Sequence, residues 1–223
     1  MELQESAETK KDRIIRASKI LFYEKGYNDT TYEDICEAAQ VTLGTVTYHL
    51  SGKRNIARTL MEEFETEHKA IMESLTGGRY DLRTMTALRI LRWWERMNLD
   101  RNIQRFLTQL AQEGILRTVL GSYIEHVFQM LILEYDLYIS DRRLKLIATA
   151  HIGLTDELLL SLSDEQGAEN IMEIADFIIE SLFKALDTDY ITIRDLIKRT
   201  HEIYDTIDND NDYFAYFRYG EEA

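Results

Sequence analysis

The sequence predicts an all-α fold. Its 223 residues include no proline and only ten glycines, so few positions would interrupt a helix. Leu, Ile, Glu, Ala and Arg are abundant, and apolar residues recur three and four positions apart, as on one face of a helix. No segment favours a strand over a helix when the two patterns are compared. Because 45% of the residues are apolar, the chain can form a substantial core.

Composition also limits where the protein works. The single cysteine, Cys36, excludes an internal disulfide framework and suits a reducing compartment. No run approaches the ~20 apolar residues that a membrane-spanning helix needs. Residues 1–12 are polar and of mixed charge, unlike a signal peptide. We therefore expect a cytoplasmic protein.

The first helix is predicted over residues 9–25. Gly26 follows it, at the position after a helix end where glycine adopts a left-handed conformation without strain. Tyr27 is placed to pack back on the helix, as is usual beside such a cap. The apolar stripe of this helix contains Ile14, Ala17, Ile20 and Leu21, with Ile15 and Phe22 as further candidates.

Two short helices come next. Thr31 is placed to cap the second helix, and Asp34 lies three residues on, which is the spacing of a capping box. A turn at residues 40–41 separates it from the third helix, which Thr42 caps and which ends near His49.

Longer helices make up the rest of the chain. Ser51-Gly52 interrupts the pattern, a fourth helix follows over residues 53–75, and Thr76-Gly77-Gly78 forms a loop. Further helices are expected near 80–98, 101–113, 115–138, 142–163, 168–187 and 190–208, with breaks or caps at Asp100, Asp141, Ser163/Asp164 and Asp189. The segment from Asp208 onward is acidic and then aromatic, and it either docks on the body or frays. We expect two domains, residues 1–52 and 53–223.

The N-terminal segment resembles the TetR family of bacterial transcriptional regulators. The matching run extends without gaps over about 45 residues, and its cap, turn, aromatic pair and lysine fall at the family's offsets. Gln40, Thr47 and Leu50 depart from the family pattern, which has glycine in the turn and aromatic residues at the other two positions. The match comprises Ile14–Ala17, Leu21–Tyr27, Thr30-Thr31, Asp34-Ile35, Glu37–Ala39, Val41-Thr42, Gly44–Val46, Tyr48-His49 and Lys53–Ile56.

The resemblance implies a helix-turn-helix that places the third helix in the DNA major groove. Gly44 would let the backbone approach the bases, and Leu43 or a threonine methyl could contact a thymine methyl. Thr31 and Lys53 would contact phosphates. Alternatively, the threonines serve only as helix caps and Tyr48 is half-buried. The expected DNA-binding residues are Thr31, Thr42, Leu43, Gly44, Thr45, Thr47, Tyr48, His49 and Lys53.

The charge distribution is compatible with DNA binding although the net charge is −14. Residues 1–60 contain nine basic and nine acidic residues, so the remaining 17 basic and 31 acidic residues carry the whole net charge. Charges are screened over ~8 Å at physiological salt, so an acidic body would repel distant DNA only weakly.

We call the DNA-binding domain, residues 1–52, the head and the remaining residues the body. Two heads placed on a two-fold dimer would read an inverted repeat. The last two long helices of the body usually form the dimer interface in the family, which points here to 142–163 and 168–187. Their apolar faces could instead be buried within one subunit, and the additional helix at 190–208 leaves the choice open. The apolar residues concerned are Leu144, Ile147, Ala148, Ile152, Leu158, Leu159, Leu162, Ile171, Ile174, Phe177, Ile178 and Leu182.

Family members often bind a small molecule in the helical body. Aromatic and methionine side chains with a few polar groups suit an apolar or aromatic ligand, although each of them could equally be ordinary core. The candidates are Trp93, Trp94, Met97, Phe106, Tyr123, His126 and Met130.

The sequence contains no phosphate loop, dinucleotide glycine pattern or nucleophile elbow, so we expect neither an enzyme nor a cofactor or metal site. The prediction is a dimeric repressor, released from its operator DNA by a small-molecule effector. The alternative is a protein of the same fold that activates transcription or responds to a protein partner.

Overall fold

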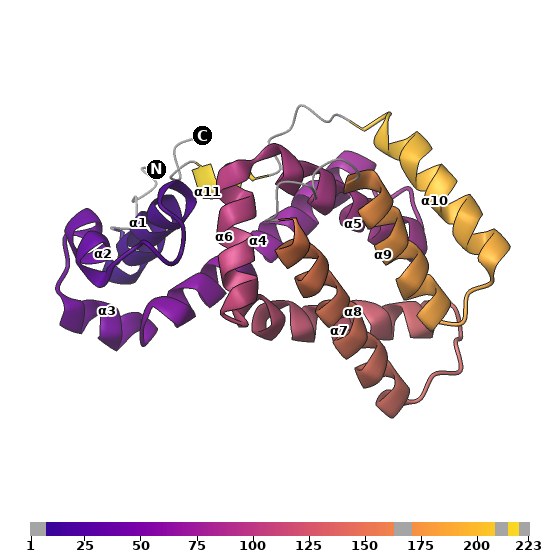
Figure 1. Ribbon diagram of the computed structural model, residues 1–223, viewed down its shortest axis with the longest axis horizontal. Coiled ribbons are helices and arrows are strands. Elements are labelled where there is room, and N and C mark those ends of the chain that lie inside the picture. The colour runs from indigo at the N-terminus through magenta and orange to yellow at the C-terminus, as the bar shows by residue number, and fades with distance from the viewer. Residues whose placement is uncertain (1–7, 163–170, 208–213, 219–223) are drawn as a thin grey trace, which may run out of the picture.

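The computed structural model describes residues 8–162, 171–207 and 214–218, and within these ranges it contains helices and no strand (Figure 1). The all-α prediction is confirmed. The helices are α1 (Lys10–Glu24), α2 (Tyr32–Ala39), α3 (Leu43–Leu50), α4 (Lys53–Thr76), α5 (Leu82–Leu99), α6 (Arg101–Gln112), α7 (Ile115–Glu134), α8 (Asp141–Ser161), α9 (Ile171–Ala185), α10 (Tyr190–Tyr204) and α11 (Ala215–Arg218).

Helices α1–α3 form a small bundle at one end of the molecule (Figure 1). The predicted capping box is present, because the Thr31 side chain accepts from the Asp34 amide while the Asp34 carboxylate accepts from the Thr31 amide. Gln40 ends α2 in the left-handed conformation, with φ of 53°. A non-glycine residue there costs roughly 1 kcal/mol. Ile35, Val46 and other apolar residues fill the centre of this bundle.

Helix α4 leads from this bundle into the body. Its first half buries Ile56, Ala57, Leu60 and Met61 in the main core. Its second half reaches the body, where Met72 is also buried. One continuous helix therefore joins the two parts of the molecule.

The body contains α5–α10. A second apolar cluster, which includes Leu144, Ile179 and Phe183, lies between α5, α7, α8, α9 and α10. Most predicted boundaries agree within a few residues, and Asp100 and Asp189 are N-caps as expected. Asp141 is not a cap, since it lies inside the first turn of α8 and Ser140 caps that helix.

The predicted helix 115–138 is too long. Helix α7 ends at Glu134, and Asp136 takes a left-handed φ of 49°, which directs the chain out of the helix. The prediction ran on to residue 138 because the sequence stays apolar beyond Glu134. Leu137 and Ile139 are apolar because they pack on the second cluster from the loop. The expected break at Ser163/Asp164 and the acidic residues 208–212 lie outside the described residues.

The aromatic end of the chain docks in its described part. Phe214 and Phe217 are 1% and 0% exposed. Helix α11 lies beside α1 and α6 (Figure 1). Among the described helices, none combines the length and apolar character needed to cross a membrane.

Candidate nucleic-acid interface and effector cavity

Helix α3 presents one face to solvent and packs the other on α1 and α4. Val46 and Leu50 are buried, 0% and 5% exposed. Tyr48, on the opposite side of the helix, is 84% exposed, and Leu43, in the first turn, is 54% exposed. Seven of the nine residues predicted to contact DNA lie on α3 or its cap and are exposed or half-buried: Thr42, Leu43, Gly44, Thr45, Thr47, Tyr48 and His49.

Hydrogen bonds within α3 determine what its hydroxyls can offer. The Thr47 hydroxyl donates to the Leu43 carbonyl at 3.0 Å, so it is left with acceptor capacity. Thr42 caps the helix, since its hydroxyl accepts from the Thr45 amide at 3.3 Å. Tyr48 is not half-buried against α1, because its ring extends into solvent with the His49 ring edge-on at 5.0 Å.

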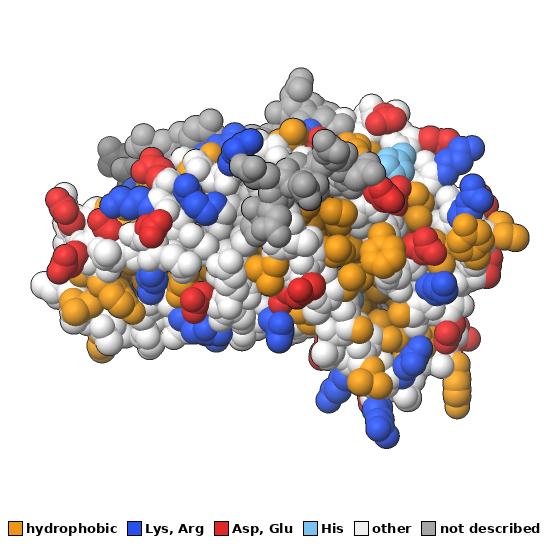
Figure 2. Space-filling view, in the orientation of Figure 1, with side chains coloured by type: hydrophobic (Ala, Val, Ile, Leu, Met, Phe, Trp, Pro, Cys, Tyr) orange, Lys and Arg blue, Asp and Glu red, His pale blue; other side chains and the backbone are white. Residues whose placement is uncertain are grey.

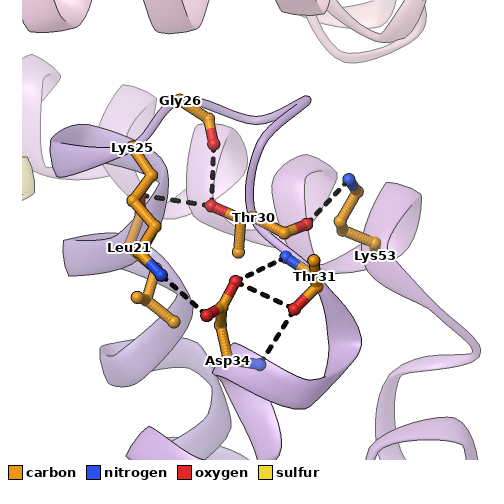
Figure 3. Close-up of polar contacts among 7 residues, drawn as sticks. All are labelled: Leu21, Lys25, Gly26, Thr30, Thr31, Asp34 and Lys53. Carbon is orange, nitrogen blue, oxygen red and sulfur yellow. Dashed lines mark hydrogen bonds and ion pairs between the residues drawn. The ribbon is translucent and has the colours of Figure 1, made fainter.

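Thr31 is exposed at the N-terminus of α2, inside a polar network (Figure 3). The Lys25 ammonium lies 2.6 Å from Asp34, and this contact, with the hydrogen bonds from Thr31, lowers the pKa of the Asp34 carboxyl to about 2. Asp34 therefore stays ionised at neutral pH and keeps accepting the hydrogen bond from the Thr31 amide. Both donors of Thr31, its backbone amide and its hydroxyl, are directed to Asp34 Oδ2, each at 2.9 Å.

Lys53 has a structural role that the sequence did not indicate. Its ammonium donates to the Thr30 carbonyl at 3.0 Å (Figure 3). It also donates to the Tyr27 carbonyl at 2.8 Å and lies 4.4 Å from the Tyr27 ring centroid. Desolvation lowers its pKa from the usual value. Since an ammonium has three donors, one remains for a phosphate. Lys53 thus ties the segment between α1 and α2 to α4.

Tyr32 is a part of this site that the sequence analysis missed. Its hydroxyl accepts from the Lys53 amide at 2.9 Å, at the first residue of α4. A Cβ at Gly52, where φ is 116°, would lie 2.9 Å from the same hydroxyl. The only sequence signal was an aromatic residue directly after the Thr31 cap. Tyr32 thus fixes the N-terminus of α4 beside that of α2.

Contacts between residues about 80 positions apart join α1 to the body. The Arg105 guanidinium donates to the carbonyls of Tyr23 and Glu24, at 3.0 and 2.7 Å. The Asn28 amide donates to the Gln109 side chain at 3.1 Å. Helix α6 therefore holds the end of α1. Local sequence patterns carry no information on such pairings.

A cavity of about 360 Å³ lies in the body between α4, α5, α7, α8 and α9. It is within the size range of small-molecule sites. Met97 and Phe106, which were predicted to bind a ligand, do not line it. Both are 0% exposed in the main core, and Phe106 stacks on Phe22 at 5.7 Å. The other candidates, Trp93, Trp94, Tyr123, His126 and Met130, do line it.

The cavity wall is mostly apolar and electrically balanced. Arg89 pairs with Glu65 at 3.0 Å, and its guanidinium lies 4.7 Å from the Tyr123 ring. Burial lowers the pKa of His68 well below its usual value, and that of His151 to about 4. Both imidazoles are therefore uncharged at neutral pH. Lys69 and Glu73, which pair at 3.9 Å, are largely exposed.

Comparison with known proteins agrees with the geometry of the head. The family model described as bacterial regulatory proteins, tetR family, matches residues 14–60, which include α2, α3 and the start of α4. Residues 14–60 are thus those of a TetR-family regulator. Among the described residues, no group of three His, Cys, Asp or Glu side chains could hold a metal ion.

Two curated relatives extend the similarity into the body. The chain is 24% identical over 131 residues to the probable HTH-type transcriptional regulator YttP of Bacillus subtilis, covering 56% of this chain and 63% of that protein. It is 26% identical over 152 residues to IcaR of Staphylococcus epidermidis, a negative transcriptional regulator of a biofilm operon, covering 68% and 77%. These relatives are regulators and not enzymes, in agreement with the sequence prediction.

Solved structures share the fold over most of this chain. RolR bound to resorcinol superposes with a TM-score of 0.63 at 19% identity, covering 85% of this chain and 93% of RolR. The repressor FadR of Thermus thermophilus, in complex with lauroyl-CoA, gives 0.62 at 17% identity, covering 78% and 94%. At these identities the similarity establishes the fold alone.

Proposed function

We propose that this protein is a dimeric transcriptional repressor. A head of residues 1–52 would bind one half of an inverted-repeat operator, and a body of residues 53–223 would dimerise and bind a small-molecule effector. The observation that carries this proposal is the solvent-exposed face of α3, where Leu43 and Tyr48 are held in water beside hydroxylic side chains. The printed name of IcaR, a negative regulator, supports repression.

Base readout and phosphate contact predict different mutational effects. Leu43→Ala and Thr45→Ala should change the preferred operator sequence, with about 1–3 kcal/mol lost at one base position. Lys53→Ala should weaken binding to all sequences similarly, because phosphates carry no sequence information. It should also destabilise the head, since Lys53 bonds the carbonyls of Tyr27 and Thr30.

The test is selection of binding sites from random double-stranded DNA by the wild type and the three variants, followed by salt-dependent titrations. The proposal is excluded if the wild type selects no inverted repeat and binds DNA only in a salt-sensitive, sequence-independent way. Equal losses on every sequence for all three variants would contradict the assigned contacts.

Dimerisation through α8 and α9 needs an apolar face that the subunit itself leaves open. Eight of the twelve apolar residues that suggested this interface are buried within the subunit: Leu144, Ile147, Ala148, Ile152, Leu159, Leu162, Ile178 and Leu182. They explain the packing of α8 and α9 on the body, so the interface must use other side chains.

Such a face remains. Phe177 of α9 is 51% exposed, and Leu146 of α8 is 59% exposed. Leu154, Leu158 and Ile174 are half-buried. Figure 2 shows apolar side chains gathered over α9 and the neighbouring part of α8. We call this set of five residues the α8–α9 face and propose that a second copy of the chain packs against it in the dimer.

The cavity favours a small-molecule effector over a protein partner, and its chemistry favours an uncharged one. A carboxylate ligand would have to compete with Glu65 for Arg89 and leave one buried carboxylate without its partner, which is unfavourable. A flat apolar ligand can pack on Trp93 and Tyr123 without that cost. The neighbour RolR was solved with resorcinol, an uncharged phenol.

Two probes with one skeleton test the charge preference. We expect 2-naphthol to raise the melting temperature and to quench tryptophan fluorescence, whereas 2-naphthoate at the same concentration should do neither. Trp93→Leu, on the cavity wall, should abolish the response, and Met97→Leu, in the core and away from the cavity, should retain it. A stronger response to 2-naphthoate would contradict an uncharged effector.

A further inference from the structure

The described C-terminal residues, 214–218, do not lie on the helix that precedes them in the chain. Helix α10 is on the side of the body away from the head, whereas α11 lies beside α1 and α6 (Figure 1). Residues 214–218 therefore lie at the junction between head and body. Neither the DNA-binding face nor the effector cavity includes it.

An aromatic cluster joins three helices through this segment. The Phe217 ring centroid lies 5.1 Å from that of Phe64 in α4 and 5.5 Å from that of Phe106 in α6. Phe106 in turn stacks on Phe22 of α1, at 5.7 Å. Phe214 stacks on Phe64 from the same segment, at 5.5 Å. The buried surface of α11 thus connects the head helix α1 with α4 and α6.

Polar contacts close the same junction. The Arg218 guanidinium donates to Asp100 Oδ2, at 3.0 Å from Nε and 2.5 Å from Nη2. The same oxygen accepts from the Tyr23 hydroxyl of α1 at 3.2 Å, while Oδ1 caps α6 by accepting from the Asn102 amide at 3.0 Å. Asp100 is 6% exposed, so solvent screens this ion pair weakly. One carboxylate therefore links α11, α1 and α6.

Tyr216 adds a contact on each side of the junction. Its hydroxyl donates to Glu63 of α4 at 2.7 Å, and the Lys19 ammonium of α1 lies 4.3 Å from its ring centroid. Each residue of α11 that makes a described side-chain contact thus touches α1, α4 or the start of α6. Such a set of contacts would resist rotation of α1 about the start of the body.

We propose that α11 is a clamp that positions the DNA-reading head relative to the body. By fixing α1 against α4 and α6, it would set the distance between the two α3 helices of the dimer. Glu65 and His68, which line the effector cavity, follow Phe64 within about one turn of α4. A shift of α4 on effector binding would therefore act directly on the clamp. The proposal rests on the proposed function in that the head binds DNA.

The experiment compares two buried phenylalanines of the full chain. Phe217→Leu alters the clamp, and Phe183→Leu removes the same volume from the second cluster, where Phe183 is 1% exposed. Arg218→Gln removes the ion pair to Asp100 without altering the aromatic cluster. Each protein is titrated with the inverted repeat that the wild type selects, and with versions whose half-sites are two base pairs closer or farther apart.

We expect Phe217→Leu and Arg218→Gln to bind the selected repeat about three- to thirtyfold more weakly than wild type. They should lose less affinity than wild type when the half-site spacing is changed, because their heads are less constrained. Phe183→Leu should keep the wild-type spacing preference at a comparable loss of melting temperature. Identical spacing profiles for all four proteins would overturn the clamp.

Hydrogen exchange of the free proteins separates this proposal from the proposed function. Phe217→Leu should speed exchange of α1 amides relative to those of α9, and Phe183→Leu should do the reverse. If the wild type selects no DNA, the proposed function fails, and the exchange pattern still decides whether α11 holds the head. Unchanged α1 exchange in Phe217→Leu would overturn the clamp independently of DNA.

Discussion

Phe177→Asp should convert the protein from a dimer to a monomer and weaken its binding to an inverted repeat by at least about a hundredfold. Phe177 is the 51% exposed aromatic residue of the α8–α9 face. Two-fold symmetry places the substitution twice in one interface, and each carboxylate would have to lose water in an apolar contact. The loss of DNA affinity follows because a single head reads only one half-site.

The measurement is molar mass by light scattering during gel filtration, followed by DNA titration. Ile191→Asp is the matched control, because Ile191 is 72% exposed on α10, outside the α8–α9 face. It should remain dimeric and bind DNA as the wild type does. If Ile191→Asp is monomeric and Phe177→Asp remains dimeric, the interface lies on α10 and the α8–α9 face is not used.

Arg89→Met should lower the free energy of unfolding at pH 7 by about 2–4 kcal/mol, because it leaves Glu65 buried without its partner. The two side chains are 19% and 12% exposed and lie 3.0 Å apart. Lys69→Met is the matched control from the same cavity. Lys69 and Glu73 are 65% and 63% exposed, so this change should cost no more than about 0.5 kcal/mol.

The stability difference between wild type and Arg89→Met should shrink as the pH falls from 7 toward 5. Burial already raises the pKa of Glu65 above its usual 4.5, and Arg89 opposes that rise. Without Arg89 the pKa rises further, so the folded variant binds a proton at a pH where the unfolded chain does not. Its stability therefore increases as the pH falls through that range.

In the wild type Arg89 limits the rise in the pKa of Glu65, so the wild type gains this stability only at a lower pH than the variant does, and the difference narrows in between. Urea unfolding of both proteins at pH 5, 6 and 7 measures the effect. A difference that stays constant across this range would show that Glu65 is not the group responsible.

Local sequence determines the helices of the head well. Thr31 and Asp34 specify a capping box by their spacing, and Gly26 follows the end of α1 with φ of 90°. These signals lie within four residues of the backbone groups that they satisfy, so a single sequence contains them. The exposed face of α3 follows in the same way, since Val46 and Leu50 alone are apolar on its inner side.

The cavity could be predicted only in part. Trp93 and Trp94 line it while Met97, one turn farther along the same helix, is core. Apolar periodicity indicates which side chains leave water and does not distinguish a filled core from a hollow one. That difference depends on how far α4, α5 and α7 stand apart, which no residue of α5 encodes by itself.

Short-range caps and apolar periodicity are enough to predict an all-α fold, the helix boundaries of the head and the exposed α3 residues, and the same local run carries the resemblance to the TetR family. Three other features appear only once the helices are packed together: Lys53 bonds the carbonyls of Tyr27 and Thr30, eight apolar residues of α8 and α9 belong to the subunit core, and α11 docks against α1. Each of these depends on residues distant in sequence, whose pairing is set by the packing of whole helices.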